Sequence, residues 1–345
     1  LGGFAIVKTG DTTANITVAD PTILDFETNP TFSLTVTVAD TTGVFDTTTV
    51  NIALNDLGEP IVIDPASWPA AGITLIRIGN IIHIYETGTT NDIVPPNNII
   101  NVPSIAFTAR DDASDTLTVD YSGGDPVPVG GISFDGGGGV GVNRLELVNG
   151  MVVDVTHDFA GGGAGTVTVD ADGAGGNPAT VITYLQLQPV SDQLMTTNRI
   201  FNFSDADDIV TLQDDATAAD GVAELVSSAN FSGFSFSVPA GTLTINMGQG
   251  GDALTVDGVD SNYGGSLTAN GGTGPIVPDG EVDTLIGSDG VETFIVNAED
   301  AGTMVTAGGL TTNFLEFESL DGQGDDDSFT VDNGVTLNGD LAGGE

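Results

Sequence analysis

Three consecutive aspartates, Asp325, Asp326 and Asp327, form the densest group of side chains in the sequence that could do chemistry. Adjacent carboxylates repel one another unless a cation or ample water screens them, so this triplet is a candidate cation site. The whole chain favours the same chemistry, because it carries 49 Asp and Glu against 5 Lys and Arg, for a formal net charge of −44. A field of this sign attracts cations and opposes folding, and bound Ca²⁺ or high salt would relieve the self-repulsion.

Residues 1–60 hold the most specific motif. The phrase Leu24-Asp25-Phe26-Glu27 precedes a predicted strand that ends at Asp40, and a second strand leads to Asn55-Asp56-Leu57-Gly58-Glu59-Pro60. This arrangement resembles the second half of a cadherin-like repeat, in which acidic residues coordinate Ca²⁺ at a domain junction. The resemblance implies a partial β-sandwich and a Ca²⁺ site built from hard carboxylate oxygens. The four matching acids are Glu27, Asp40, Asp56 and Glu59. Gly58 replaces the usual Asn, and solvated loop acids are the alternative interpretation.

Gly-rich corners that contain Asp are a second, weaker candidate for Ca²⁺. The stretch Gly248-Gln249-Gly250-Gly251-Asp252-Ala253-Leu254 resembles the nonapeptide of repeats-in-toxin proteins, in which Gly-rich turns and Asp wrap the ion. That resemblance adds Asp252, together with the Asp325–Asp327 triplet, to the candidate ligands. Nonapeptide arrays repeat every nine residues, whereas the copies here lie about 25 residues apart. The spacing therefore favours the alternative that Gly and Asp simply form corners.

Composition argues against several partners. Phosphate binding needs Lys and Arg, so neither nucleic acid nor an anionic membrane surface is an expected partner. The sequence contains no Cys, which excludes disulfides and thiolate metal sites. It also lacks an apolar run of about 18 residues, so we expect no direct membrane insertion.

No constellation in the sequence favours an enzyme, and we expect no catalytic residues. The two histidines, His83 and His157, lie 74 residues apart in apolar strands, where we expect outward positions. A β-helix lyase for acidic sugars would need basic residues beside its site. Those present are dispersed: Lys8, Arg77, Arg110, Arg144 and Arg199. A carboxylate pair for glycoside hydrolysis can be neither named nor excluded among 49 acids.

The elements that must position these side chains are strands. Period-two alternation predicts strands over residues 31–38 and 48–54. Two further apolar strands, 73–78 and 81–85, are joined by Gly79-Asn80, a pair that favours a tight hairpin. No amphipathic helix of three turns is present, so the predicted fold class is all-β.

From about residue 100, a phrase of the form D-x-L-x-V recurs, often after a Gly-rich turn. Its copies begin at Asp115, Asn143, Asp252, Asp283, Glu292 and Asp327. Comparable units that begin at Leu243, Leu267 and Phe317 are 24 and 50 residues apart, one and two turns of a period near 25. Stacked repeats of this length predict a β-solenoid, similar to a parallel β-helix, with Leu, Val, Ile and Phe inward and Thr outward. A β-sandwich with long Gly-rich loops is the competing fold.

These patterns predict three parts. Residues 1–60 form a partial cadherin-like β-sandwich, residues 61–100 a linker with lead-in strands, and residues 101–345 β-solenoid repeats that stop inside a Gly-rich motif. The sequence begins without Met, and we interpret it as a window of a longer chain.

Three phrases resemble the repeats of giant planctomycete-type and related marine bacterial surface proteins. They are Arg77–Tyr85, Asp115–Gly124 and Asn313–Asp325. The resemblance implies secretion, a cell-surface location, and a structural or adhesive role in a fibre, stalk or coat. Its expected partners are copies of itself or neighbouring repeats of one long chain, with Ca²⁺ as a candidate stiffening ion. The alternative is a cell-surface module that binds a glycan or a receptor.

Overall fold

The computed structural model describes residues 3–26, 28–55, 58–173, 178–187, 190–227, 231–272 and 281–343. Within these ranges the chain is all-β, as the sequence predicts, apart from short 3₁₀ turns at Pro21–Ile23, Pro65–Ser67 and Ile99–Asn101. None of the helices in these ranges is long and apolar enough to cross a membrane. The chain divides into two compact units, Leu1–Glu59 (unit 1) and Pro60–Glu345 (unit 2).

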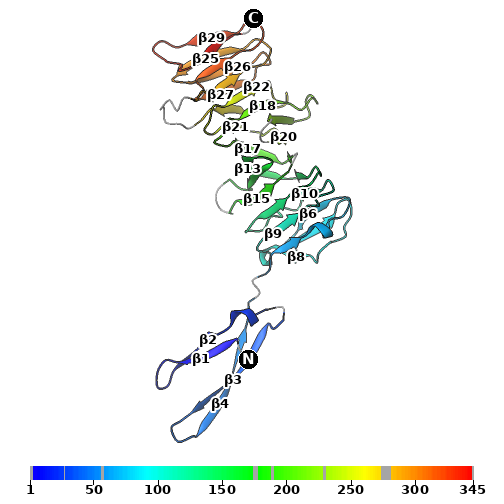
Figure 1. The fold of residues 1–345 in the computed structure, drawn as a ribbon, viewed down its shortest axis with the longest axis vertical. Coiled ribbons are helices and arrows are strands. Elements are labelled where there is room, and N and C mark those ends of the chain that lie inside the picture. The colour runs from blue at the N-terminus through cyan, green and yellow to red at the C-terminus, as the bar shows by residue number, and fades with distance from the viewer. Residues whose placement is uncertain are drawn as a thin grey trace. The chain divides into compact units, whose positions relative to one another are not determined.

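Unit 1 contains two antiparallel hairpins (Figure 1). Strand β1 (Phe4–Lys8) pairs with β2 (Ala14–Val18), and β3 (Thr31–Ala39) pairs with β4 (Phe45–Ala53). The second hairpin confirms both strands that alternation predicts in this region. The rings of Phe4 and Phe32 meet edge to face, with centroids 5.2 Å apart, and connect the two hairpins.

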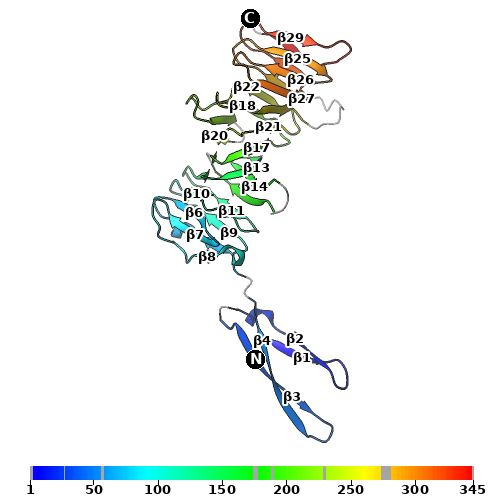
Figure 2. The ribbon, with the colours of Figure 1, turned by 180° about the vertical axis from the view of Figure 1, so that it is seen from behind.

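Unit 2 is built from two sheets of thirteen described strands each. The strands of sheet I are β5 (Ile61–Ile63), β9 (Ile105–Thr108), β11 (Ile132–Asp135), β13 (Met151–Gly161), β14 (Ala164–Asp170), β15 (Thr180–Leu185), β17 (Met195–Asn202), β21 (Thr242–Asn246), β23 (Ser266–Asn270), β25 (Thr293–Ala298), β26 (Ala301–Val305), β27 (Thr311–Leu315) and β29 (Ser328–Val331). The strands of sheet II are β6 (Ile73–Ile78), β7 (Ile81–Glu86), β8 (Asn97–Asn98), β10 (Thr116–Asp120), β12 (Arg144–Val148), β16 (Val190–Asp192), β18 (Ile209–Asp214), β19 (Val222–Ser227), β20 (Phe231–Ser237), β22 (Ala253–Val256), β24 (Thr284–Ile286), β28 (Ser319–Asp321) and β30 (Leu341–Ala342). Figures 1 and 2 show these strands following one another along the unit, from cyan near β6 to red at β29.

The chain passes back and forth between the two sheets, and most passes add a strand parallel to an earlier one. Leu243 of β21 lies beside Leu267 of β23, which confirms the separation of 24 residues read from the sequence. Leu267 then pairs with Thr312 of β27, so the expectation that Phe317 begins the next equivalent unit is wrong. The step is not a multiple of 25 because strands β25 and β26 are inserted before β27.

Four antiparallel three-stranded segments interrupt the parallel order. They alternate between the sheets: β6–β7–β8 in sheet II, β13–β14–β15 in sheet I, β18–β19–β20 in sheet II and β25–β26–β27 in sheet I. Because each segment adds two extra strands to one sheet, their alternation keeps the sheets equal in strand number. The tight turn predicted at Gly79-Asn80 is confirmed, since Ile78 pairs with Ile81.

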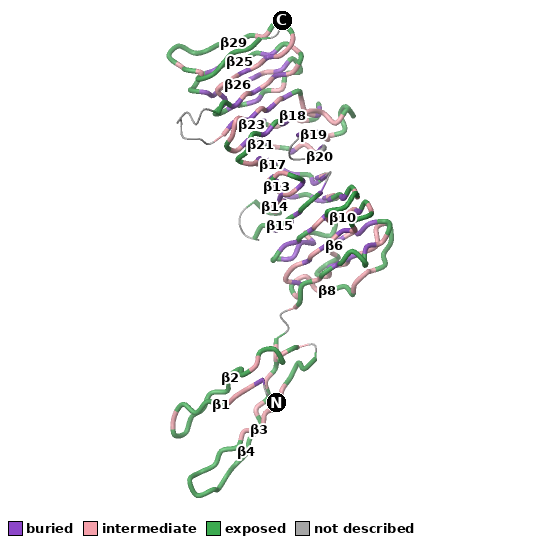
Figure 3. The backbone as a smooth tube through the Cα atoms, in the orientation of Figure 1, coloured by how far each residue is buried: buried purple, intermediate pink, exposed green. Residues whose placement is uncertain are grey.

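Burial alternates along the strands of unit 2, as Figure 3 shows. In β22, Leu254 and Val256 are fully buried, whereas Ala253 and Thr255 are only partly covered. The D-x-L-x-V phrase therefore aims its apolar positions into the core between the sheets. Removing these side chains from water is the main favourable contribution to the stability of the unit.

A charged centre lies inside this core. Asp192 of sheet II faces His157 and Arg199 of sheet I, and all three side chains are fully buried. His157 Nε2 lies 2.8 Å from Asp192 Oδ2, which also accepts a hydrogen bond from the Arg199 guanidinium. Burial lowers the pKa of His157 and leaves its imidazole neutral. Burial alone would raise the pKa of Asp192, but Arg199 and His157 outweigh this effect and lower that pKa to about 2.

The expected outward position of His157 is wrong. Val152 and Val155 are both buried although they lie three residues apart, so the inward parity shifts within β13. His157 and Phe159 follow Val155 into the core, where the imidazole stacks on the rings of Phe159 and Phe201. The sequence is ambiguous at this point, because Val152 and Val153 occupy both parities, although Val155 and Phe159 share the parity of His157.

Replacement of Arg199 by Met should leave the Asp192 carboxylate buried without its cation. We expect the free energy of unfolding to fall by about 3–5 kcal/mol. The double variant Arg199→Met/Asp192→Leu should recover much of this loss, because no buried charge remains. Urea denaturation measures all three proteins.

The matched control is Arg144→Met, which removes an exposed guanidinium 3.4 Å from Glu146 and should change stability by less than about 1 kcal/mol. A double variant less stable than Arg199→Met alone would contradict this account of the charged centre.

Candidate functional site

Four carboxylates stack in one column at the corner where the chain enters sheet II. Each precedes the first residue of a strand, β18, β22, β24 or β28. We call Asp208, Asp252, Asp283 and Glu318 the carboxylate column. Neighbouring strands of a sheet lie about 4.8 Å apart, so successive members are close enough to repel one another.

Backbone hydrogen bonds hold the carboxylate column in place. The N–H of Asp208 donates to Asp252 Oδ1 at 2.7 Å, and the N–H of Asp252 donates to Asp283 Oδ1 at 2.8 Å. The N–H of Asp283 in turn donates to Glu318 Oε2 at 2.9 Å. Asp252, Asp283 and Glu318 thus each satisfy the amide one strand earlier, which gives the acidic residue of the repeated phrase a structural role.

At an earlier corner of the same sheet, repulsion between stacked carboxylates is avoided by a different set of residues. The N–H of Asp115 donates to Asn143 Oδ1 at 2.7 Å, so an uncharged amide replaces the second carboxylate. Arg110 neutralises Asp115 through a guanidinium contact of 2.6 Å. No Lys or Arg follows Arg199 in the sequence, so the carboxylate column has no such counterion of its own.

Asp252 responds most strongly to this arrangement. Its side chain is 1 % exposed, and its Oδ2 is buried without a hydrogen-bond partner. Burial, followed by the neighbouring charges of Asp283 and Asp208, raises the pKa of Asp252 to about 7. The Asp208 N–H opposes this shift only in part.

A shorter pair repeats the pattern at a corner that leads into sheet I. The N–H of Glu292 donates to Asp327 Oδ1 at 2.8 Å, so Asp327 of the predicted triplet turns toward its neighbouring strand. Asp325 and Asp326 are exposed. The three adjacent aspartates therefore do not converge on a common point.

The acids predicted as Ca²⁺ ligands in residues 1–60 are only partly covered. Glu27 and Asp56 lie outside the described residues. Asp40 lies at the tip of the β3–β4 hairpin, where Oδ1 accepts from the N–H groups of Thr42 and Val44 at 2.8 and 3.0 Å. The Thr42 hydroxyl and then these amides lower the pKa of Asp40.

Glu59 follows the other end of the same hairpin. Strand β3 has nine residues, so roughly 30 Å separate the tip from this end. Asp40 and Glu59 are therefore not brought together by the hairpin. In the described ranges, no three Asp, Glu or His side chains gather closely enough to hold a metal ion. Ca²⁺ binding by the chain stays a prediction.

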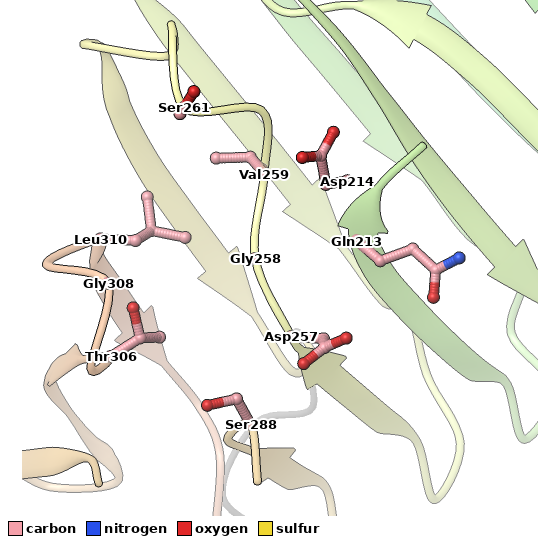
Figure 4. Close-up of a pocket in the computed structure, with 10 residues that line it drawn as sticks. All are labelled: Gln213, Asp214, Asp257, Gly258, Val259, Ser261, Ser288, Thr306, Gly308 and Leu310. Atoms are coloured by element: carbon pink, nitrogen blue, oxygen red, sulfur yellow. The ribbon is translucent and has the colours of Figure 1, made fainter. Parts of the chain in front are cut away.

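An open groove of about 470 Å³ lies on unit 2, between the β22–β23 loop, the end of β18 and the β26–β27 turn (Figure 4). Its lining residues are Gln213, Asp214, Asp257, Gly258, Val259, Ser261, Ser288, Thr306, Gly308 and Leu310. Asp214 contributes a buried Oδ1 that has no hydrogen-bond partner. The groove combines hydroxyl, carboxylate and amide groups with two aliphatic side chains and holds no basic group.

Sequence reasoning missed Asp208 and Glu318 as members of the carboxylate column. The signal was present, because each immediately precedes a short alternating apolar stretch, as Asp252 and Asp283 do. The groove has no comparable signal, since its lining comes from segments far apart in the chain.

Substitution of Asp252 by Asn should make unit 2 less sensitive to pH. Because the folded-state pKa of Asp252 is raised, its stabilising contribution is fully present below about pH 4 and is lost as the pH rises through about 7. Asp252→Asn should exceed the natural protein in unfolding free energy by about 1–3 kcal/mol at pH 8, and this difference should vanish toward pH 4. Urea denaturation across this pH range tests it.

Asp326→Asn removes one exposed charge and serves as the control for net charge. Parallel pH profiles for Asp252→Asn and the natural protein would show that Asp252 does not hold a proton in the folded state.

No protein-family model, curated protein or solved structure matches the chain. What the protein does is therefore inferred from its own residues.

Proposed function

We propose that unit 2 is a β-solenoid rod and that the chain is an extracellular structural or adhesive segment of a large secreted bacterial surface protein. The observation that carries this proposal is the parallel stacking of successive passes around one apolar core. Such stacks extend by adding passes and share mechanical load through their backbone hydrogen bonds. A fibre, stalk or surface coat uses these properties.

The distribution of charge supports a role outside catalysis. His157 and Arg199, two of the few side chains able to act as a base or to bind an anion, are fully buried, and both contact the buried Asp192. His83 lies on β7, and its Nδ1 is 3.1 Å from Asp92 Oδ2 in the loop that follows β7. We therefore propose that the protein is not an enzyme.

Sheet edges provide a contact through which copies, or neighbouring repeats of one long chain, would pack. Among the described strands, β29 pairs only with β25, and β30 only with β28. The N–H groups of Ser328 and Asp332 point toward β25, so by alternation the N–H of Val331 points away from it. An outward edge of this kind accepts a further strand.

Electron microscopy should show filaments of the natural chain, with length that grows with protein concentration. Val331→Pro should abolish them, because it removes an outward donor while leaving the bonds to β25 intact. Val331→Ala is the matched control and should still assemble. Monomeric particles at every protein concentration would contradict the fibre proposal.

Ca²⁺ is proposed as a stiffening ion. The supporting observations are the net charge of −44 and the resemblance of residues 1–60 to a cadherin-like repeat. The Gly-Asp corners at Asp252 and Asp325–Asp327 are the weaker candidates, since Asp252 is buried.

Addition of a chelator at low salt should lower the midpoint of thermal unfolding, and Ca²⁺ should restore it. Na⁺ at equal ionic strength separates binding from general screening of self-repulsion. Identical melting curves with and without chelator would remove Ca²⁺ from the proposal.

The groove favours a second candidate function, a cell-surface module that binds a glycan or receptor. Its mixed polar and aliphatic lining is the specific observation behind this alternative. A rod and a binding module are compatible, because an adhesive fibre needs a site on its surface.

A further inference from the structure

We propose that the groove between the β22–β23 loop, the end of β18 and the β26–β27 turn binds a neutral saccharide. This proposal rests on the adhesive part of the proposed function and gives it a site and a ligand class. The rod architecture does not depend on it.

The size and lining of the groove fit a sugar. Its volume of about 470 Å³ is within the range of small-molecule sites. Ser261 and Thr306 offer hydroxyls that both donate and accept, as a ring of sugar hydroxyls requires, whereas the Ser288 hydroxyl already donates to Glu292 Oε1. Val259 and Leu310 point toward each other in Figure 4 and supply apolar surface for the C–H face of a pyranose.

Asp214 supplies the most specific recognition element. It lies at the end of β18 on the groove wall, and its side chain is only partly covered. A carboxylate is a strong hydrogen-bond acceptor with two oxygens, so it favours a donor on a ligand in the groove. A sugar hydroxyl is such a donor and adds no charge to the site.

Charge selects against acidic sugars and against a bare metal ion. The sequence has no Lys, Arg or His after Arg199, so nothing in this half of unit 2 can neutralise a uronate or sulfate. Only two carboxylates, Asp214 and Asp257, line the groove, whereas Ca²⁺ takes six to eight oxygen ligands. A neutral, hydroxyl-rich ligand matches both limits.

The groove is formed before a ligand arrives. The N–H groups of Asp257 and Gly258 donate to Leu212 O at 3.0 and 3.3 Å and dock the loop on β18. Asp260, 1 % exposed, accepts from Asp220 N and Asn262 N at 2.9 and 2.7 Å and ties the loop to the β18–β19 turn. Ligand binding therefore carries only a small entropy cost for ordering the loop.

Two glycines allow the groove to be filled without strain. A Cβ at Gly258 meets no atom within 4 Å, and at Gly308 the nearest atom is Thr306 Oγ1 at 3.8 Å. Neither residue has a left-handed backbone. Gly258→Phe and Gly308→Leu should therefore fold normally and occupy the groove. Gly138→Phe is the matched control, since Gly138 has equally open surroundings and does not line the groove.

Binding is measured on an array of neutral and uronate-containing oligosaccharides, followed by calorimetry with the strongest neutral oligosaccharide. We expect the natural chain and Gly138→Phe to bind neutral sugars only. Gly258→Phe and Gly308→Leu should weaken binding at least about tenfold, and Asp214→Ala should do the same through the loss of an acceptor. Circular dichroism and thermal melting of each variant verify its fold.

Three results would overturn the proposal: no binding to any neutral oligosaccharide, binding that both groove-filling variants leave unchanged, or preference for uronates. Binding of Ca²⁺ in the absence of sugar, if Asp214→Ala abolishes it, would show that the groove is a cation site. The same samples are examined by electron microscopy. Filaments without sugar binding would contradict only the saccharide site in the groove. Sugar binding without filaments would contradict only the fibre proposal.

Discussion

Parallel stacking in register is the constraint on which the rest of unit 2 depends. Because each strand lies beside its equivalent in an earlier pass, like residues meet like residues about 4.8 Å apart. For Leu243 and Leu267 this repetition builds a continuous core. For Asp252 and Asp283 it places charge beside charge, at roughly 3 kcal/mol per pair if both were ionised at 5 Å in an effective dielectric of 20.

The chain meets this electrostatic problem in two ways. Near Arg110 it uses a guanidinium and the amide of Asn143, so the corner is neutral. Beyond Arg199 no basic side chain is available, and the carboxylate column relies on backbone N–H donors and on the raised pKa of Asp252. The later half of unit 2 is therefore the part whose stability we expect to depend on pH.

Alternating three-stranded segments let the stack grow without distortion. A segment in one sheet alone would add two strands that face no strand of the opposite sheet. The next segment lies in the opposite sheet and makes the two sheets equal in strand number again. The buried centre of Asp192 and Arg199 lies between two such segments, β13–β15 and β18–β20, with aromatic rings around it. The groove uses the turn of a third segment, β26–β27, as one wall.

The sequence by itself determined the fold class and the inward face of most strands, because period-two alternation is a local property that survives in β3, β4, β6 and β22. It also marked Asp252 and Asp283 as repeated corner residues. Only the tertiary structure decided which acids stack, since partners lie 31 to 44 residues apart and the inserted segments set that distance. It also placed His157 inside, through a parity shift in β13, and assembled the groove from distant segments. These outcomes depend on strand pairing across the whole unit, which no local pattern encodes.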